Sequence, residues 1–287
     1  KYGYNYISTL LMTIIPAKIA KVKEIVVVTP PKNVTKYFVY TLYKLGIKEV
    51  YRIGGVQAIA ALAFGTQTVP KVDMIVGPGN VWVTEAKRQL IGKIGVDLLA
   101  GPSEIVVVAD NSYSVEEIVF ELLAQTEHDK NAKGYLISLN ENFARKIREY
   151  IDCFAKNFSR QIEVVFESKL KNVVKMINKI APEHLTLLTK KQEYFVKNVT
   201  NAGAIFYGKN PSAVFGDYIA GPSHVLPTNT TARFSSGLCV ASFIKKISIV
   251  KFTKKSVKYL LKHTSKLAEV EGMLYHKDRI SKINLKF

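Results

Sequence analysis

Short apolar runs alternate with longer amphipathic segments along most of the chain, and turns rich in glycine or proline separate them. Three of these runs have the β-branched composition of buried strands: residues 24–29, 49–53 and 73–76. Helical spacing of apolar residues follows each run, over residues 33–45, 57–64 and 81–91. Because this alternation is typical of parallel strands joined by right-handed helical crossovers, it predicts an α/β sheet.

A second set of alternating segments begins at residue 104 with the apolar run EIVVVA. Ser114 has the position of an N-cap and acidic residues follow it, which predicts a helix to about His128. A strand over 134–139 and a long amphipathic helix over 142–158 come next. We expect strand–helix alternation to continue to about residue 250, and a lysine-rich helix over 254–269 to precede a short polar tail.

This pattern predicts two Rossmann-like domains, each built on a parallel sheet, followed by a short helical tail. We place the domains at residues 1–103 and 104–250 and the tail at residues 251–287. The sequence begins KYGYNY without an initiator methionine or a secretory signal. We therefore expect the fold to be incomplete at its N-terminus, with the N-terminal part of the second domain missing.

Composition places the chain among soluble globular proteins, with 48% hydrophobic and 22% charged residues. No uninterrupted apolar stretch reaches the roughly 18–20 residues of a membrane span, so we expect no membrane partner. The net charge of +18 raises the possibility of nucleic-acid binding. Because the lysines are spread along the whole chain, we interpret them as solvated surface and expect no nucleic-acid partner. The two distant cysteines, Cys153 and Cys239, indicate reduced core thiols in a cytoplasmic protein.

Histidine is scarce, and its distribution carries most of the chemical information. Four of the five histidines lie in polar clusters: Gln125-Thr126-Glu127-His128, Pro182-Glu183-His184, Gly216-Asp217 with Ser223-His224, and Glu271 with His276. The fifth, His263, lies on the lysine-rich helix without polar company, and we interpret it as a surface residue.

Each cluster admits a chemical and a structural interpretation. Gln125 and His128 are three residues apart on one helix face and could share a metal ion, or simply cap an exposed helix end. Glu183 beside His184 offers two groups that move protons near neutral pH, or an exposed loop pair. Glycines around Asp217 would let the backbone approach a metal or substrate closely.

The glycine-rich turns between strands and helices are the candidate segments for nucleotide binding. No G-x-G-x-x-G motif follows any strand, so the ordinary Rossmann fingerprint is absent. Gly54-Gly55 and residues 77–80 (GPGN) instead precede helix N-termini, where backbone N–H groups could bind a phosphate or an amide. Tight turns alone would also explain these glycines.

Read in order, several segments resemble the histidinol dehydrogenase family over essentially the whole chain. The matching segments are IGGVQAIAALAFGT (53–66), VPKVDMIVGPGN (69–80), VTEAKRQL (83–90), AGPSEIVVVAD (100–110), LLAQTEHD (122–129), APEHL (181–185), GDYIAGPSHVLPT (216–228) and ARFSSGL (232–238). The resemblance implies a homodimer that oxidises L-histidinol to L-histidine through L-histidinal, the last step of histidine biosynthesis. Such an enzyme uses two NAD and one Zn²⁺.

The resemblance also implies a role for each clustered residue. Zinc ligands would be Gln125, His128 and Asp217, together with His276 from the tail of the partner subunit. His184 would accept the alcohol proton in the first oxidation, and Glu183 would activate water in the second. The four zinc ligands and His184 also match substrate-contacting positions. Ser103, His224 and Glu271 match such positions as well. Gln57 and Asn80 match NAD-contacting positions, so the first domain would bind NAD and the second would hold the zinc.

The chain also departs from the family pattern. Family members carry a long region ahead of the point where this sequence starts, and KYGYNY does not keep the glycine pair of a nucleotide loop there. One alternative to an active enzyme is therefore a catalytically impaired, truncated remnant that retains dimerisation and metal binding. A basic nucleic-acid-binding protein is the third hypothesis, and a salt-sensitive gel shift would favour it.

Overall fold

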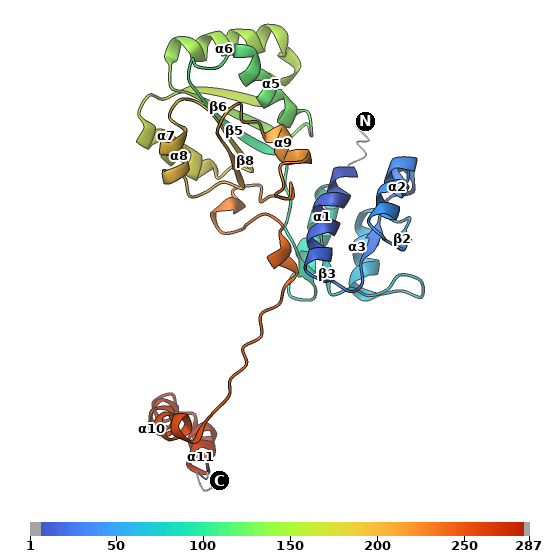
Figure 1. Ribbon diagram of the computed structural model, residues 1–287, viewed down its shortest axis with the longest axis vertical. Coiled ribbons are helices and arrows are strands. Elements are labelled where there is room, and N and C mark those ends of the chain that lie inside the picture. The colour runs from blue at the N-terminus through green and yellow to red at the C-terminus, as the bar shows by residue number, and fades with distance from the viewer. Residues whose placement is uncertain (1–6, 284–287) are drawn as a thin grey trace. The chain divides into compact units, whose positions relative to one another are not determined.

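A computed structural model describes residues 7–283 of the chain (Figure 1). The chain forms two compact units, of which the first ends at Ile244 and the second begins at Lys245. Within residues 7–283, no helix is both long enough and apolar enough to cross a lipid bilayer. The boundary expected between residues 103 and 104 lies inside the first unit and stays a prediction.

The N-terminal part of the first unit holds two separate pairs of parallel strands. Its elements are α1 (Ile7–Ile19), β1 (Val26–Val28), η1 (Pro31–Asn33), α2 (Lys36–Lys44), β2 (Glu49–Tyr51), α3 (Gly55–Phe64), β3 (Met74–Ile75), α4 (Val81–Gln89) and β4 (Gly95–Val96). Strand β1 pairs with β2, and β3 pairs with β4. The strands are shorter than the sequence pattern predicted, and helix α1 occupies a segment for which the sequence analysis predicted no element.

A buried ion pair stabilises the glycine-rich loop of this part. Lys87 on α4 pairs with Asp97, and both side chains are almost fully buried. The Lys87 ammonium also donates to the Gly77 carbonyl oxygen at 2.9 Å, and Asp97 accepts from the Gly77 N–H at 2.7 Å. Asn80 then caps α4, since its side-chain oxygen accepts from the N–H groups of Trp82 and Val83. The loop over residues 77–80 is therefore held at both ends.

The C-terminal part of the first unit is built on one five-stranded parallel sheet. Its elements are β5 (Glu104–Ala109), α5 (Val115–Thr126), β6 (Lys133–Ser138), α6 (Glu141–Phe154), η2 (Lys156–Phe158), β7 (Ile162–Phe166), α7 (Leu170–Ile180), β8 (His184–Leu188), α8 (Gln192–Asn198), β9 (Ala204–Phe206) and α9 (Ala213–Tyr218). The strand order is β7-β6-β5-β8-β9, and every pairing is parallel. Counted along the chain this is 3-2-1-4-5, the Rossmann order, so the predicted α/β class with parallel sheets is confirmed.

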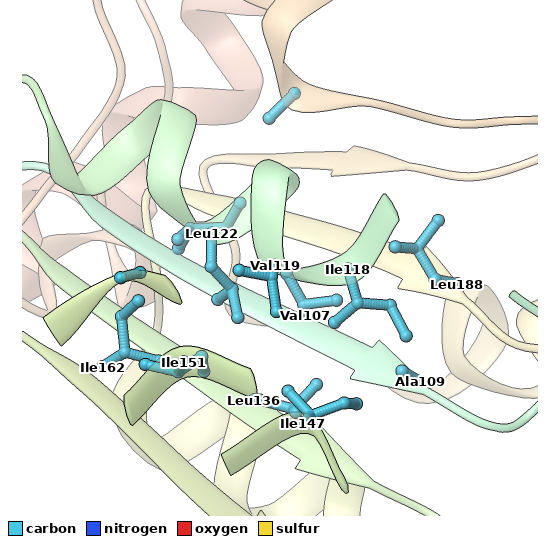
Figure 2. Close-up of a cluster of buried hydrophobic side chains, with 13 residues drawn as sticks. Val107, Ala109, Ile118, Val119, Leu122, Leu136, Ile147, Ile151, Ile162 and Leu188 are labelled. Atoms are coloured by element: carbon cyan, nitrogen blue, oxygen red, sulfur yellow. The ribbon is translucent and has the colours of Figure 1, made fainter. Parts of the chain in front are cut away.

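The central strand β5 is buried on both faces, which explains its continuous apolar sequence. Val107 faces the layer of α5 and α6, where it lies in one cluster with Leu122 and Ile147 (Figure 2). Val106 faces the opposite layer, in a cluster with Val173 of α7. At the start of α5, Ser114 and Glu117 form the reciprocal capping box that the sequence predicted.

Three sequence-based expectations about the C-terminal half were wrong. Strand–helix alternation stops at α9, because residues 219–253 form loops with two short helical turns, η3 (Thr231–Arg233) and η4 (Val240–Phe243). The helix expected over 142–158 ends at Phe154. The expected core thiols, Cys153 and Cys239, are both exposed, since one lies on the outer face of α6 and the other precedes η4.

The second unit consists of two helices, α10 (Lys254–Val270) and α11 (Leu274–Ser281). Thr253 caps the first helix by accepting a hydrogen bond from the Ser256 N–H. Gly272, with φ of 70°, allows the chain to turn before α11 begins. The predicted lysine-rich helix is thus present, whereas the polar tail expected after it contains a second helix, which packs on α10.

Candidate active site

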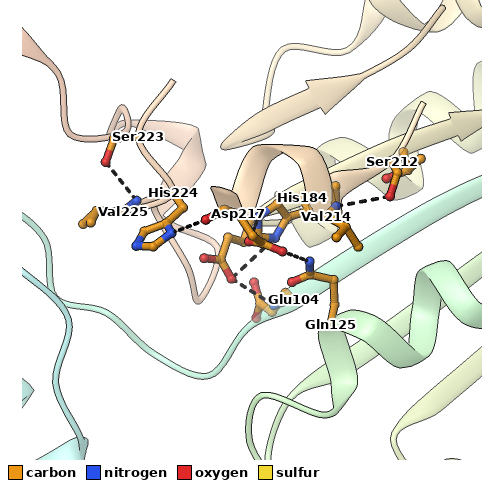
Figure 3. Close-up of polar contacts among 12 residues, drawn as sticks. Glu104, Gln125, His184, Ser212, Val214, Asp217, Ser223, His224 and Val225 are labelled. Carbon is orange, nitrogen blue, oxygen red and sulfur yellow. Dashed lines mark hydrogen bonds and ion pairs between the residues drawn. The ribbon is translucent and has the colours of Figure 1, made fainter. Parts of the chain in front are cut away.

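Three of the four polar clusters of the sequence meet at the amino ends of the central strands. His184 is the first residue of β8, Glu183 directly precedes it, and Ser103 directly precedes β5. Gln125 lies in the last turn of α5. Because crossover helices run antiparallel to the strands, the C-terminal end of α5 returns to this same edge of the sheet. Short helix α9 adds Asp217, so three elements converge here (Figure 3).

The imidazole of His184 is buried between two carboxylates. Its Nδ1 lies 3.8 Å from Glu183 Oε2, and its Nε2 lies 3.7 Å from Asp217 Oδ1. Neither ring nitrogen has a hydrogen-bond partner among the described residues. Burial, together with the charges of nearby His128 and His224, lowers the pKa of His184 to about 3. The ring is therefore neutral, and Phe206 stacks against it with ring centroids 5.9 Å apart.

Glu183 is a buried carboxyl group with few donors. Burial raises the pKa of Glu183 to about 8, because a charged carboxylate loses its hydration there, and the charges of Asp217 and Glu104 act in the same direction. Hydrogen bonds from the Glu104 N–H, at 3.3 Å, and from the Ser103 side chain oppose this shift without cancelling it. Protonated and ionised forms of Glu183 are thus both accessible near neutral pH.

Asp217 and Gln125 form the second half of the cluster. The Gln125 amide donates to Asp217 Oδ2 at 2.6 Å, while the buried Gln125 Oε1 has no partner among residues 7–283. Burial raises the pKa of Asp217, although the Gln125 hydrogen bond and the charges of His128 and His224 lower it in part. His128 lies in the turn directly after α5, half-buried and close enough to act on both Asp217 and His184.

His224 joins the cluster to helix α1. Its Nδ1 donates to the Asp217 backbone carbonyl oxygen at 2.8 Å, since a carbonyl can only accept. Its Nε2 lies 3.0 Å from the Thr9 hydroxyl, which donates to it when the ring is neutral. The neighbouring Ser223 hydroxyl donates to the Met12 carbonyl oxygen at 3.1 Å. The loop that follows α9 is thereby attached to a helix more than two hundred residues earlier in the sequence.

The donor atoms of the cluster fit a divalent cation such as zinc. An amide oxygen without a partner, a half-buried carboxylate and an imidazole meet at the end of α5, and zinc accepts nitrogen and oxygen ligands of these kinds. Within residues 7–283, no three His, Cys, Asp or Glu side chains are grouped closely enough to bind a metal by themselves. The expected set draws only His128 and Asp217 of these types from the first unit.

Two of the remaining predicted residues lie elsewhere in the first unit. Gln57 is exposed on the first turn of α3, and Asn80 is exposed at the start of α4. The structure records no polar contact between either side chain and the Glu183–His184 cluster. Their predicted role toward NAD stays a prediction.

The other two predicted residues belong to the second unit. Glu271 directly follows α10 and His276 lies on α11, and both side chains are exposed. Their predicted role in a partner's site also stays a prediction.

Sequence reasoning missed two residues that contact the site. Glu104 donates its backbone N–H to Glu183, and its position directly after Ser103 at the start of a strand was a signal that could have found it. Thr9 contacts His224, but no spacing or motif in the sequence relates residues so far apart.

A mainly apolar recess of about 350 Å³ borders the cluster. Phe206, which stacks on His184, and Gly216, which precedes Asp217, are among the residues that line it. A more polar cavity of about 480 Å³ lies at the opposite edge of the sheet, between the loops that follow β5 and β8. The recess, unlike this cavity, could hold part of a small substrate next to the cluster.

Comparison with known proteins gives consistent matches over nearly the whole chain. A family model described as histidinol dehydrogenase matches residues 3–282. A histidinol dehydrogenase of Prochlorococcus marinus is 42% identical, over 94% of this chain and 64% of its own length. One from Methanocaldococcus jannaschii is 41% identical, over 96% of this chain and 67% of its own length.

A solved structure agrees with these sequence matches. The crystal structure of histidinol dehydrogenase from Elizabethkingia anophelis superposes with a TM-score of 0.90 and 35% identity, covering 98% of this chain and 68% of that one. The chain thus spans about two thirds of the length of the relatives it matches. Both the sequence and the fold place this chain in the histidinol dehydrogenase family.

Proposed function

We propose that the chain is the larger part of an NAD- and zinc-dependent histidinol dehydrogenase, which oxidises L-histidinol to L-histidine through L-histidinal. The observation that carries the proposal is the convergence of Glu183 and His184 with Asp217 and Gln125 at one edge of the sheet. The names of the relatives supply the substrate. Each oxidation removes two electrons as one hydride, together with one proton, so two NAD are consumed for each histidinol.

Gln125, His128 and Asp217 would hold the zinc ion, with His276 of a second copy as the fourth ligand. When bound, zinc supplies positive charge that orients the substrate nitrogens, and NAD accepts the hydride. The Gln125 oxygen without a partner supports this assignment, because a buried amide oxygen normally has a donor or a cation beside it. Gln57 and Asn80 would contact NAD from the first turns of α3 and α4.

His184 would accept the hydroxyl proton as the alcohol is oxidised to the aldehyde. Neither nitrogen of its neutral, buried ring has a partner among the described residues, so the unprotonated nitrogen can accept a hydrogen bond from the substrate. Glu183 would then take a proton from the water that hydrates the aldehyde, before the second hydride leaves. Ser103 contacts Glu183 and His224 contacts Asp217, and both would also contact the substrate at this edge of the sheet. Glu271 of the tail would be a further substrate contact.

The second unit supports a homodimer. Large apolar side chains of its helices are exposed, among them Tyr275 at 89%, Val270 at 73% and Leu274 at 70%. A soluble chain rarely leaves such side chains together in water, so a second copy is a suitable surface for them. Light scattering on the purified chain should give twice the monomer mass. A cytoplasmic location is part of the proposal, and two exposed free cysteines are compatible with a reducing compartment.

The decisive experiment follows NADH formation at 340 nm with histidinol and NAD, with and without a zinc chelator. We expect histidinol-dependent NADH that the chelator abolishes, and a loss of roughly 10²–10⁴-fold in turnover for His184→Asn, the usual contribution of a general base. His263→Asn is the matched control, because His263 is an exposed histidine on α10. Zinc binding without NADH formation would instead indicate the impaired remnant, and equal rates in the two variants would reject the role of His184.

A further inference from the structure

A second buried carboxylate lies one helical turn before Gln125 and has no place in the chemistry above. Glu121 on α5 is 6% exposed and accepts three hydrogen bonds. The Thr186 hydroxyl donates to its Oε1 at 2.7 Å, and the Ser212 hydroxyl donates to its Oε2 at 2.6 Å. The Ala213 N–H donates to Oε1 at 2.7 Å. One carboxylate therefore connects α5, β8 and the start of α9.

These contacts repeat the arrangement of the site one step away along each element. Glu121 precedes Gln125 by four residues on α5, and Ala213 precedes Asp217 by four residues on α9, so each pair shares a helix face. Thr186 follows His184 by two residues on β8, so both side chains point to the same face of the sheet. The Glu121 contacts join Glu121, Thr186 and Ala213, and the site joins Gln125, His184 and Asp217 on the same three elements.

Helix α9 needs such an anchor because it has only six residues. A helix this short is not stable without tertiary contacts, and the N–H groups of its first turn lack partners within the helix. Ser212 satisfies the Val214 N–H (Figure 3). Glu121 satisfies the Ala213 N–H and also binds the Ser212 hydroxyl. Beyond α9 the chain is loop, so Glu121 supplies the polar fixation at the start of the segment that carries Asp217.

We propose that Glu121 is a positioning residue: its carboxylate fixes α9 against α5 and β8, and so holds Asp217 beside Gln125 and His184. The ligand set for zinc, and the contact of Asp217 with His184, then depend on a residue that touches neither metal nor substrate. The zinc part of this inference rests on the proposed function, whereas the anchoring of α9 does not.

The test compares Glu121→Ala with Asp110→Ala in the 287-residue chain. Asp110 is a matched control, because it accepts hydrogen bonds from Ser112, Thr189 and the Lys190 N–H. These contacts lie at the carboxyl ends of β5 and β8, at the opposite edge of the sheet from the site. The zinc dissociation constant is measured by competition with a chromogenic chelator, and amide hydrogen exchange over residues 213–218 is measured in the metal-free protein.

We expect Glu121→Ala to weaken zinc binding by about 10–100-fold, the usual effect of removing a residue that orients a metal ligand. Exchange in α9 should accelerate in the same variant, whereas Asp110→Ala should lower stability and leave both readouts unchanged. Glu121→Gln should lie between wild type and alanine, since its amide oxygen still accepts from Ala213 and its amino group can donate to the Ser212 oxygen. This milder variant serves if the alanine protein does not fold.

Three outcomes separate the explanations. If wild type binds zinc and Glu121→Ala changes neither zinc affinity nor exchange in α9, the positioning role is wrong. If Asp110→Ala causes the same losses, the effect is general destabilisation and the positioning role is again wrong. If wild type binds no zinc but Glu121→Ala accelerates exchange in α9 alone, the proposed function fails and the anchoring role stands.

Discussion

The buried ion pair between Lys87 and Asp97 allows a quantitative test of what holds the glycine-rich loop. Replacing Lys87 with Met keeps most of the side-chain volume but removes the ammonium group, so the buried Asp97 loses its counter-charge and the Gly77 carbonyl loses a donor. Removal of one partner from a buried ion pair typically costs about 3–5 kcal/mol. We expect a loss of this size in the free energy of unfolding.

The chain supplies a matched control on the same helix. Arg88, the next residue, forms an ion pair with Glu85, but both side chains are largely exposed, at 60% and 40%. Water and salt screen such pairs, so Arg88→Met should leave stability nearly unchanged. The two variants differ mainly in the burial of the pair that is removed.

Urea unfolding followed by circular dichroism at 222 nm provides the assay, with the double variant Lys87→Met/Asp97→Leu as a third protein. Removing both charges should recover part of the loss, leaving the Gly77 N–H and the Gly77 carbonyl without partners, at about 1–3 kcal/mol for a buried unpaired group. Similar unfolding midpoints for Lys87→Met and Arg88→Met would refute the reasoning, because burial would then make no difference. A double variant no more stable than the single one would show that charge pairing is not the cause.

Other positions give further expectations. Leu122→Ala removes a fully buried side chain from the main core and should lower the free energy of unfolding by about 2–5 kcal/mol in the same urea assay. Gly203→Ala should lower the rate of NADH formation, with a smaller effect on the free energy of unfolding. The added Cβ would lie 2.5 Å from the Glu183 carbonyl oxygen and displace that backbone. An unchanged rate of NADH formation would contradict this prediction. The pKa of Asp110 is lowered from 3.8 because hydrogen bonds from Ser112, Thr189 and Lys190 outweigh the opposing effect of burial. The contribution of Asp110 to the free energy of unfolding is therefore present above pH 3.8 and lost as the pH falls through the lowered pKa. Asp110→Asn should flatten the acid side of a plot of stability against pH. An unchanged acid side would show that Asp110 does not contribute.

The central strand β5 was predictable from the sequence because it is buried on both faces. The run EIVVVA at residues 104–109 has no polar interruption, and the structure has a strand over those six residues. Local signals were weaker after α9, where residues 219–253 contain apolar side chains without a strand partner, and the expected alternation was wrong there. Periodicity identifies an apolar face but does not say whether a neighbouring strand is available to pair with it.

The site was predictable in its members more than in its geometry. The i, i+3 spacing of Gln125 and His128 predicted that they lie together, and the structure has them at the C-terminal end of α5. Glu183 and His184 are neighbours in the sequence, so their proximity was predictable as well. Their meeting with Asp217 depends on the topology, which returns the C-terminal end of α5 to the amino ends of the strands. The anchoring contacts of Glu121 are also invisible in sequence, because residues 121, 186 and 212 come together only in the folded chain.

The location of this cluster has a practical consequence for protein engineering. Open parallel sheets usually bind ligands beyond the carboxyl ends of their strands, whereas the residues gathered here lie at the amino ends. The short connections that leave β6 and β7 at the other edge, residues 139–140 and 167–169, therefore lie away from the residues gathered here. A fluorescent reporter or an affinity handle inserted at these two places would sit a full strand length from the reacting groups.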